Sequence, residues 1–230
     1  MTATRPVRAL GVDACKKGWV GISSDARGYF GATITELVAA AELDGALAVV
    51  GVDMPIGLPI NTVRQSDALA RGLIGKRASS VFTTPVRAAI SAATHAEATA
   101  ISVSATGKGL SQQAFALSRK ILEVDVWARE AAQAVIEVHP ELSFATMQGG
   151  PLRHAKSTWS GAENRRRLLR EAGIVIPDDL GLAGAMAGVD DVLDAAAAAW
   201  TAQRYAVGDA VSHPPVPEEF GDGHLAAIWA

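Results

Sequence analysis

The sequence has few of the residues that stabilise secreted and membrane proteins. Its 230 residues include one cysteine, Cys15, so an internal disulfide and a cysteine-only zinc site are both excluded. The longest apolar run, residues 195–200, is far shorter than the roughly 20 residues of a membrane-spanning helix. The N-terminal segment, MTATRPVRAL, has no signal-peptide pattern. We therefore expect a cytoplasmic protein with no membrane partner.

Positive charge is also scarce. The chain has 21 Lys and Arg residues against 24 Asp and Glu, a net charge of −3. Proteins that grip nucleic acid over a wide surface are usually basic, so the composition disfavours that class. Two segments are nevertheless locally basic, residues 64–87 and 153–170. Each is either a solvated face or an anion-binding surface, and the sequence leaves both open.

Short apolar segments alternating with helical patterns predict an α/β fold. Glycine-containing breaks separate the first three apolar runs, which favours an antiparallel meander. The run at 47–52 is almost wholly apolar and β-branched, which is typical of a strand covered on both faces. The strands are expected at residues 7–14, 18–23, 29–34, 47–52, 134–138 and 225–229.

Helical spacing of apolar residues predicts the remaining elements. We expect helices at residues 35–43 (capped by Thr35), 66–73, 111–134, 163–172 and 190–207. This order favours one domain, residues 1–230, with a mixed sheet flanked by helices. A long inserted segment of loop and helix spans about residues 54–132.

Two of the expected strands end in an aspartate, Asp13 and Asp53. A buried lone carboxylate is unfavourable unless it is paired, hydrogen-bonded or bound to a metal. Sites in α/β sheets gather at the carboxyl ends of strands. Taken alone, Asp13 is explained equally well as a turn residue.

The last predicted helix carries further acidic residues. Asp191 and Asp194 are three apart and therefore share one helix face. A first-turn position explains Asp190 and Asp191 through the helix dipole, but it does not explain Asp194 within its run of alanines. Glu137 lies in another strand, and His139 follows it; we favour a structural role for that histidine, although it is near enough in sequence to join a site.

Carboxylates gathered in a cleft stay ionised together only when cations neutralise them. Oxygen ligands of this type favour Mg²⁺ or Mn²⁺. Two such ions about 3.5–4 Å apart can activate water and stabilise a leaving oxygen in phosphoryl chemistry. The acidic residues therefore predict a metal-dependent hydrolytic site.

Five motifs, in order along the chain, resemble an uncharacterised family regarded as ribonuclease H-like nucleases. The resemblance runs from about residue 7 to 229 and rests on GVDACKKGWVG, GVDMPIGLP, GKRASSVFTTPVR, EVHPELSF and DDVLDAAAAAW. It implies a ribonuclease H-like fold, in which the first three strands are antiparallel and the first carries an aspartate.

The resemblance also implies roles for individual residues. Asp13 and Asp53 match the two strand-end carboxylates, and Glu137 matches the glutamate of the EVHPE motif. The last helix is similar to that of Holliday-junction resolvases, which implies a metal-ligand role for Asp194 with Asp191 beside it. The third motif contains the pattern RxSSVF, which Arg77, Ser79 and Ser80 match. This pattern has no counterpart in the well-studied nucleases.

The leading hypothesis is thus a two-metal nuclease that hydrolyses nucleic acid or another phosphodiester. Asp13, Asp53 and Asp194 would hold the ions, and Glu137 would be an outer ligand or position the water. Arginine suits a phosphate because its planar fork donates two hydrogen bonds, so Arg77 would bind substrate with Ser79 and Ser80.

Two other classes remain open. An actin-like or sugar-kinase-type phosphotransferase would need two such subdomains and a second phosphate motif, which this chain does not supply. A non-enzymatic module that binds nucleic acid or protein would keep the fold without turnover. The sequence does not distinguish DNA, RNA, a branched junction or a small phosphodiester as the substrate, and it gives no oligomeric state.

Overall fold

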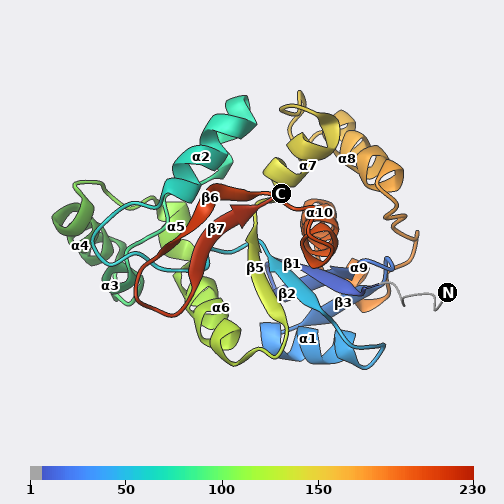
Figure 1. The fold of residues 1–230 in the computed structure, drawn as a ribbon, viewed down its shortest axis with the longest axis horizontal. Helices are drawn as coiled ribbons and strands as arrows, with labels where there is room; N and C mark the ends of the chain where they lie inside the picture. The colour runs from blue at the N-terminus through green and yellow to red at the C-terminus, as the bar shows by residue number, and fades with distance from the viewer. Residues whose placement is uncertain (1–6) are drawn as a thin grey trace.

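A seven-stranded mixed sheet organises residues 7–230, the part of the chain that the computed structural model describes (Figure 1). Its order is β3-β2-β1-β4-β5-β7-β6. Strands β1, β2 and β3 are antiparallel neighbours, β1, β4, β5 and β7 run parallel, and β6 returns antiparallel to β7. The strands are β1 (Ala9–Cys15), β2 (Gly18–Ser23), β3 (Gly28–Gly31), β4 (Val49–Val52), β5 (Ala134–Val138), β6 (Ser212–Glu219) and β7 (Leu225–Trp229). The expected α/β class with a mixed, helix-flanked sheet is confirmed. Residues 1–6, which belong to the N-terminal segment discussed above, lie outside the described residues.

Helices cover both faces of this sheet. The core on one face is formed with α1 and α6, and the core on the other with α8 and α10. The helices are α1 (Ile34–Glu42), α2 (Gln65–Ile74), the 3₁₀ helix η1 (Gly75–Ser80), α3 (Arg87–Ile90), α4 (His95–Thr106), α5 (Gln112–Ala116), α6 (Ser118–Glu130), α7 (Pro140–Gln148), α8 (Trp159–Glu171), α9 (Leu182–Met186) and α10 (Val189–Ala206). Elements α2 to α6 all lie between β4 and β5 in the chain.

The alternation of side chains along β1 assigns its residues to the two faces. Leu10 and Val12 join the core formed with α1 and α6. Gly11, between them, faces α10. Residue 13 is therefore directed to the α10 face.

Helix α10 lies unusually close to the sheet because glycines and alanines meet at the contact. A Cβ atom on Gly11 would lie 2.0 Å from the Ala195 carbonyl oxygen and 2.0 Å from the Ala199 nitrogen. A Cβ on Gly51 would lie 2.9 Å from the Ala198 carbonyl oxygen. Gly11 and Gly51 are partners in the parallel β1–β4 register, so the two strands together form a shallow floor for the helix.

Several expected boundaries are wrong, for local reasons. The first helix begins earlier than predicted because Thr33, not Thr35, is its N-cap, in a capping box with Glu36. The third strand consequently ends at Gly31. The helix expected over 111–134 is interrupted at Leu117, which ends α5 and precedes α6, and it stops at Glu130.

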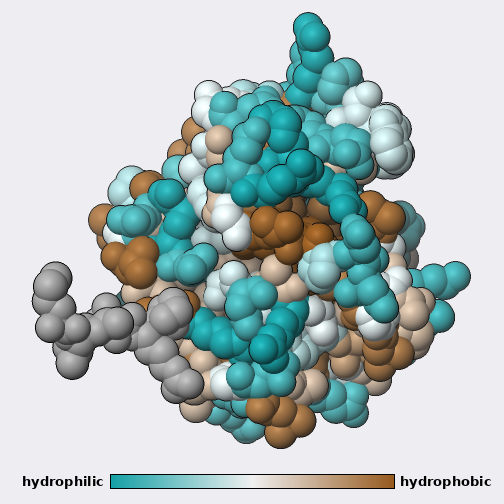
Figure 2. All heavy atoms as spheres, turned by 90° about the vertical axis from the view of Figure 1, so that its right-hand side faces the viewer, coloured by the Kyte–Doolittle hydropathy of each residue, from teal (hydrophilic) through white to brown (hydrophobic). Residues whose placement is uncertain are grey.

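The face that carries α8 and α9 has an apolar hollow between hydrophilic regions (Figure 2). Exposed apolar residues on and near these helices include Trp159, Val175, Leu182 and Val189. Among residues 7–230, none of the helices combines the length and the apolar character needed to cross a membrane.

The close approach of α10 makes Gly11 intolerant of any side chain. We expect Gly11→Ala to lower the free energy of unfolding by about 1–3 kcal/mol, because the new methyl group overlaps helix backbone that must move away. Urea unfolding measures the change. Gly72→Ala is the matched control: nothing lies within 4 Å of its added Cβ, and alanine favours the interior of α2. Equal stability of Gly11→Ala and the wild type would contradict the close packing.

Candidate metal centre

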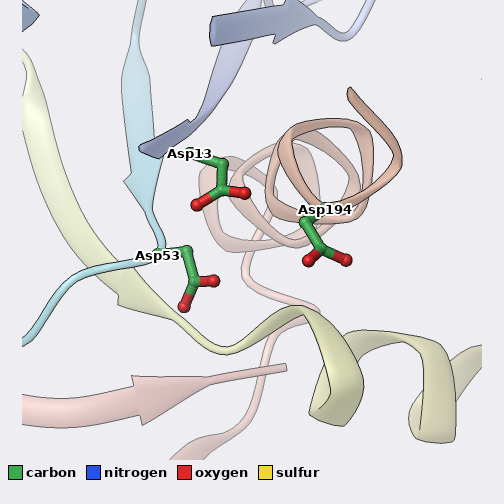
Figure 3. Close-up of side chains that lie close together, drawn as sticks. All are labelled: Asp13, Asp53 and Asp194. Carbon is green, nitrogen blue, oxygen red and sulfur yellow. The ribbon is translucent and has the colours of Figure 1, made fainter. Parts of the chain in front are cut away.

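Three aspartates from three different elements converge at the carboxyl ends of β1 and β4 (Figure 3). Asp13 is near the end of β1, Asp53 directly follows β4, and Asp194 lies in the second turn of α10. One carboxylate oxygen from each lies within 4.8 Å of the others. The spacing is close enough for one cation to contact all three.

The floor described above explains this convergence. Gly11 precedes Asp13 by two residues, and Gly51 precedes Asp53 by two, so each aspartate shares the face of its glycine. The paired glycines put the two aspartates side by side and let α10 approach. The repeated Gly-Val-Asp sequence thus places both the carboxylates and the helix that brings Asp194.

The aspartates line a cavity of about 400 Å³. Its walls are the ends of β1, β4 and β5, the beginnings of α7 and α10, residues 155–157, and part of the segment between β4 and β5, including η1. The cavity therefore combines residues of the sheet with residues of the expected insertion.

Burial and mutual repulsion perturb these carboxyl groups. Burial, together with the charges of Asp53 and Asp194, raises the pKa of Asp13 well above 3.8. Burial raises the pKa of Asp53 to about 7, against the lowering effect of Lys156. Asp13 Oδ1 accepts the Ala14 amide at 2.7 Å, which does not neutralise its charge. The cluster holds more negative charge than the protein around it compensates.

Lys156 forms an ion pair with the cluster. Its Nζ lies 2.5 Å from Asp194 Oδ2 and 3.8 Å from Asp190 Oδ2. Burial by itself lowers the pKa of Lys156, but the attraction of Asp194, Asp13 and Asp53 raises it above its ordinary value. The other oxygen, Asp194 Oδ1, is buried and has no hydrogen-bond partner.

Glu137 lines the same cavity but is not part of the three-carboxylate cluster. Its Oε2 accepts Arg64 Nη2 at 2.6 Å and the Ile56 amide at 2.8 Å. Arg64 is fully buried and also contacts Ser66. The structure thus places Glu137 in an ion pair that fixes the loop after β4.

Two further groups at the start of α7 face the cavity. Glu141 Oε1 accepts Arg165 Nη2 at 2.5 Å, while Glu141 Oε2 is buried without a partner. Burial lowers the pKa of His139, and its Nδ1 is also unpartnered. Unmatched acceptors around one cavity favour a ligand that brings positive charge or donors.

The three predicted phosphate-binding residues lie along η1 and line the cavity. Arg77 Nη2 donates to the Arg153 carbonyl at 3.1 Å, and its buried Nε has no partner. Ser80 Oγ donates to the Arg77 carbonyl at 2.8 Å, and Ser79 is exposed. Arg77 pairs with neither Asp13 nor Asp53 within residues 7–230.

Asp191 occupies a different position from the one expected for a ligand. Its Oδ2 accepts the Gly188 amide at 3.0 Å at the start of α10. It lines the cavity but does not belong to the convergent cluster. The structure therefore gives Asp191 a capping role, which its first-turn position also suggests.

A family model described as a protein of unknown function (DUF429) matches residues 11–219. The chain belongs to this family. No curated protein and no solved structure matches it. The matched range of this chain contains all three aspartates of the cluster, together with Arg77 and Lys156.

Sequence reasoning missed Lys156 and Glu141. Lys156 belongs to the basic segment at 153–170, but nothing local shows that it turns toward an aspartate on α10. Glu141 follows Pro140 in the first turn of α7, a position that an N-terminal helix dipole explains equally well. Only the docking of α7 and α8 against α10 brings these residues to the cavity.

The raised pKa values predict how stability depends on pH without divalent cations. Between about pH 4 and pH 7, folded Asp53 holds a proton that the unfolded chain has lost, and Asp13, whose pKa is also raised well above 3.8, adds to this effect. The free energy of unfolding should therefore fall as pH rises through this window, by up to ~1.4 kcal/mol per pH unit for each such proton. Urea unfolding in EDTA at several pH values measures the slope.

Two variants control this measurement. Asp13→Asn removes one titrating group and also removes the repulsion between the Asp13 and Asp53 carboxylates. The free energy of unfolding should therefore depend less steeply on pH. Asp178→Asn changes an exposed aspartate and should leave the slope as in the wild type. Stability that rises with pH across the window in the wild type would contradict the buried carboxylate cluster.

Proposed function

We propose that this chain is a metal-dependent phosphodiesterase that acts on nucleic acid, with Mg²⁺ or Mn²⁺ held by Asp13, Asp53 and Asp194. The observation that carries the proposal is the convergence of these carboxylates within 4.8 Å in a cavity. The donor set fits a hard divalent cation, and the buried, unpartnered Asp194 Oδ1 lacks the positive partner that such an ion supplies.

The arrangement of strands supports a ribonuclease H-like fold as part of this proposal. Strands β1, β2 and β3 form an antiparallel meander, and an aspartate lies near the end of the first strand. These are the two features that the sequence resemblance implies. The helix that carries Asp194 packs on β1 and β2 of this meander.

The roles of the residues follow from their positions. A divalent ion, when bound, supplies a Lewis acid for the phosphate and lowers the pKa of a coordinated water. Arg77, which lines the cavity, would bind a neighbouring phosphate through its guanidinium group, and Ser79 and Ser80 would add hydroxyl donors. Glu137, held by Arg64, would position the loop after β4 rather than act as a ligand.

Hydrolysis assays test the proposal directly. We expect cleavage of single-stranded or duplex DNA or RNA oligonucleotides with Mg²⁺ or Mn²⁺, and none in EDTA. Asp53→Asn should lower the rate by roughly 100-fold or more, because loss of a ligand removes several kcal/mol of transition-state stabilisation. Asp178→Asn is the matched control and should cleave like the wild type.

Melting curves separate the possible failures. A melting temperature raised by Mn²⁺ without hydrolysis of any substrate would favour a binding module on the same fold. A melting temperature indifferent to millimolar Mg²⁺ and Mn²⁺ would contradict the metal site itself.

Arg77→Ala tests the phosphate contact. Among residues 7–230 the side chain makes one hydrogen bond, to the Arg153 carbonyl, so the variant should fold normally and keep its response to metal. Its affinity for an oligonucleotide should fall roughly tenfold. The slope of the logarithm of the binding constant against the logarithm of salt concentration should become shallower by about 1, because one phosphate contact is lost. Fluorescence anisotropy at several salt concentrations measures both. Arg170→Ala, an exposed arginine at the end of α8, is the control. Lost stability with unchanged affinity would assign Arg77 a structural role instead.

A further inference from the structure

Lys156 changes the charge balance of the proposed metal site. The three clustered aspartates carry three negative charges when ionised, and the Lys156 ammonium supplies one positive charge in contact with Asp194. These four groups leave two negative charges, which one divalent cation would balance; Asp190, 3.8 Å from the ammonium, is partly exposed and screened by solvent. A second divalent cation would make the cluster positive and would lie close to the ammonium.

We propose that the cluster binds one divalent cation and that Lys156 takes the place of a second. This inference rests on the proposed metal-dependent function and replaces the two-metal expectation from the sequence. Lys156 contacts Asp194 Oδ2, while Asp194 Oδ1 is buried and unpartnered. Asp13, Asp53 and Asp194 Oδ1 would thus hold the ion, while Asp194 Oδ2 stays with the ammonium.

The segment that carries Lys156 is fixed rather than mobile. The Ala155 carbonyl accepts the Thr158 amide at 3.0 Å and the Thr158 hydroxyl at 2.8 Å. Thr158 is in turn the N-cap of α8, and its Oγ1 accepts the Gly161 amide at 3.1 Å. A Cβ on Gly161 would lie 1.8 Å from the Ala155 oxygen, so this turn packs directly on the helix. The lysine therefore extends from an anchored turn toward α10.

Lys156 is also suited to contact a substrate. An ammonium group has three donors, and Asp194 accepts one at 2.5 Å. The side chain is 40% exposed and lines the cavity, so its remaining donors are available to a phosphate oxygen. Lys156 thereby supplies the charge that a second ion would bring to the reacting phosphate. It is a catalytic residue in this sense and forms no covalent bond.

Two buried arginines outside the cavity lining already pair with acids that line it. Glu137 is held by the fully buried Arg64, and Glu141 by the fully buried Arg165. The protein therefore compensates the charge of both acids, and the charge left for a metal ion is that of Asp13, Asp53 and Asp194.

Electron paramagnetic resonance of bound Mn²⁺ tests the proposal. Two Mn²⁺ ions about 4 Å apart give a spin-coupled spectrum, whereas one ion gives the spectrum of an isolated centre. We expect one uncoupled Mn²⁺ per chain in the wild type. Lys156→Met should bind two ions as a coupled pair, because removal of the ammonium leaves room and negative charge for a second ion. Lys156→Arg keeps the charge and should bind one.

Lys108→Met is the matched control, since Lys108 is exposed and outside the cavity; it should behave like the wild type. A coupled pair in the wild type would overturn the role of Lys156 and leave the proposed function standing. A single uncoupled ion in folded Lys156→Met would also overturn it. Should Lys156→Met not fold, the wild-type spectrum alone still decides between one ion and a pair. Failure of the wild type to bind Mn²⁺ at all would contradict the proposed function, and this inference with it.

Discussion

The contact between α10 and the β1–β4 floor is the constraint on which the candidate site depends. Alanines of α10 pack directly on Gly11 and Gly51. The helix backbone is so close to these two strands that a Cβ atom at either glycine would overlap it. This approach brings Asp194 to the strand ends, where Asp13 and Asp53 already lie side by side. A helix held further away by larger residues would leave the strand-end aspartates as two ordinary turn residues. Packing and chemistry therefore have the same origin in the repeated Gly-Val-Asp sequence.

The distribution of cations separates structural acids from the candidate ligands. Glu137 and Glu141 each have a fully buried arginine, whose planar fork suits a fixed carboxylate. Neither Asp13 nor Asp53 forms an ion pair within the described residues. Asp194 has only Lys156, and only at one oxygen. Buried acids are unfavourable when unpaired, so Asp13 and Asp53 differ from Glu137 and Glu141 in lacking a compensating charge from the described residues.

The cluster of aspartates could be predicted because each member has a local signature. Asp13 and Asp53 end apolar strands, and Asp194 interrupts an alanine-rich helix face. Lys156 has no such signature, since its partner is on a helix that only tertiary packing brings near. Strand β6 was missed because its prolines argue against a strand; it is an edge strand, where a missing amide donor is tolerated. Helix α4 was missed because its apolar residues do not form one stripe, and Val103 is exposed.

The segment between β4 and β5 is fixed to the sheet at several points, which limits how the cavity can respond to its own charge. Arg87 bridges Asp125 on α6 and Asp222 before β7, and Asp222 also accepts the Leu58 amide at 2.8 Å. On the opposite side, α10 cannot retreat without losing its contact with the glycine floor. The three carboxylates are thus held together by packing on both sides and cannot spread apart to reduce their repulsion. Close packing around carboxyl groups that the protein compensates only in part raises their pKa values, which distinguishes this cluster from acids exposed on a surface.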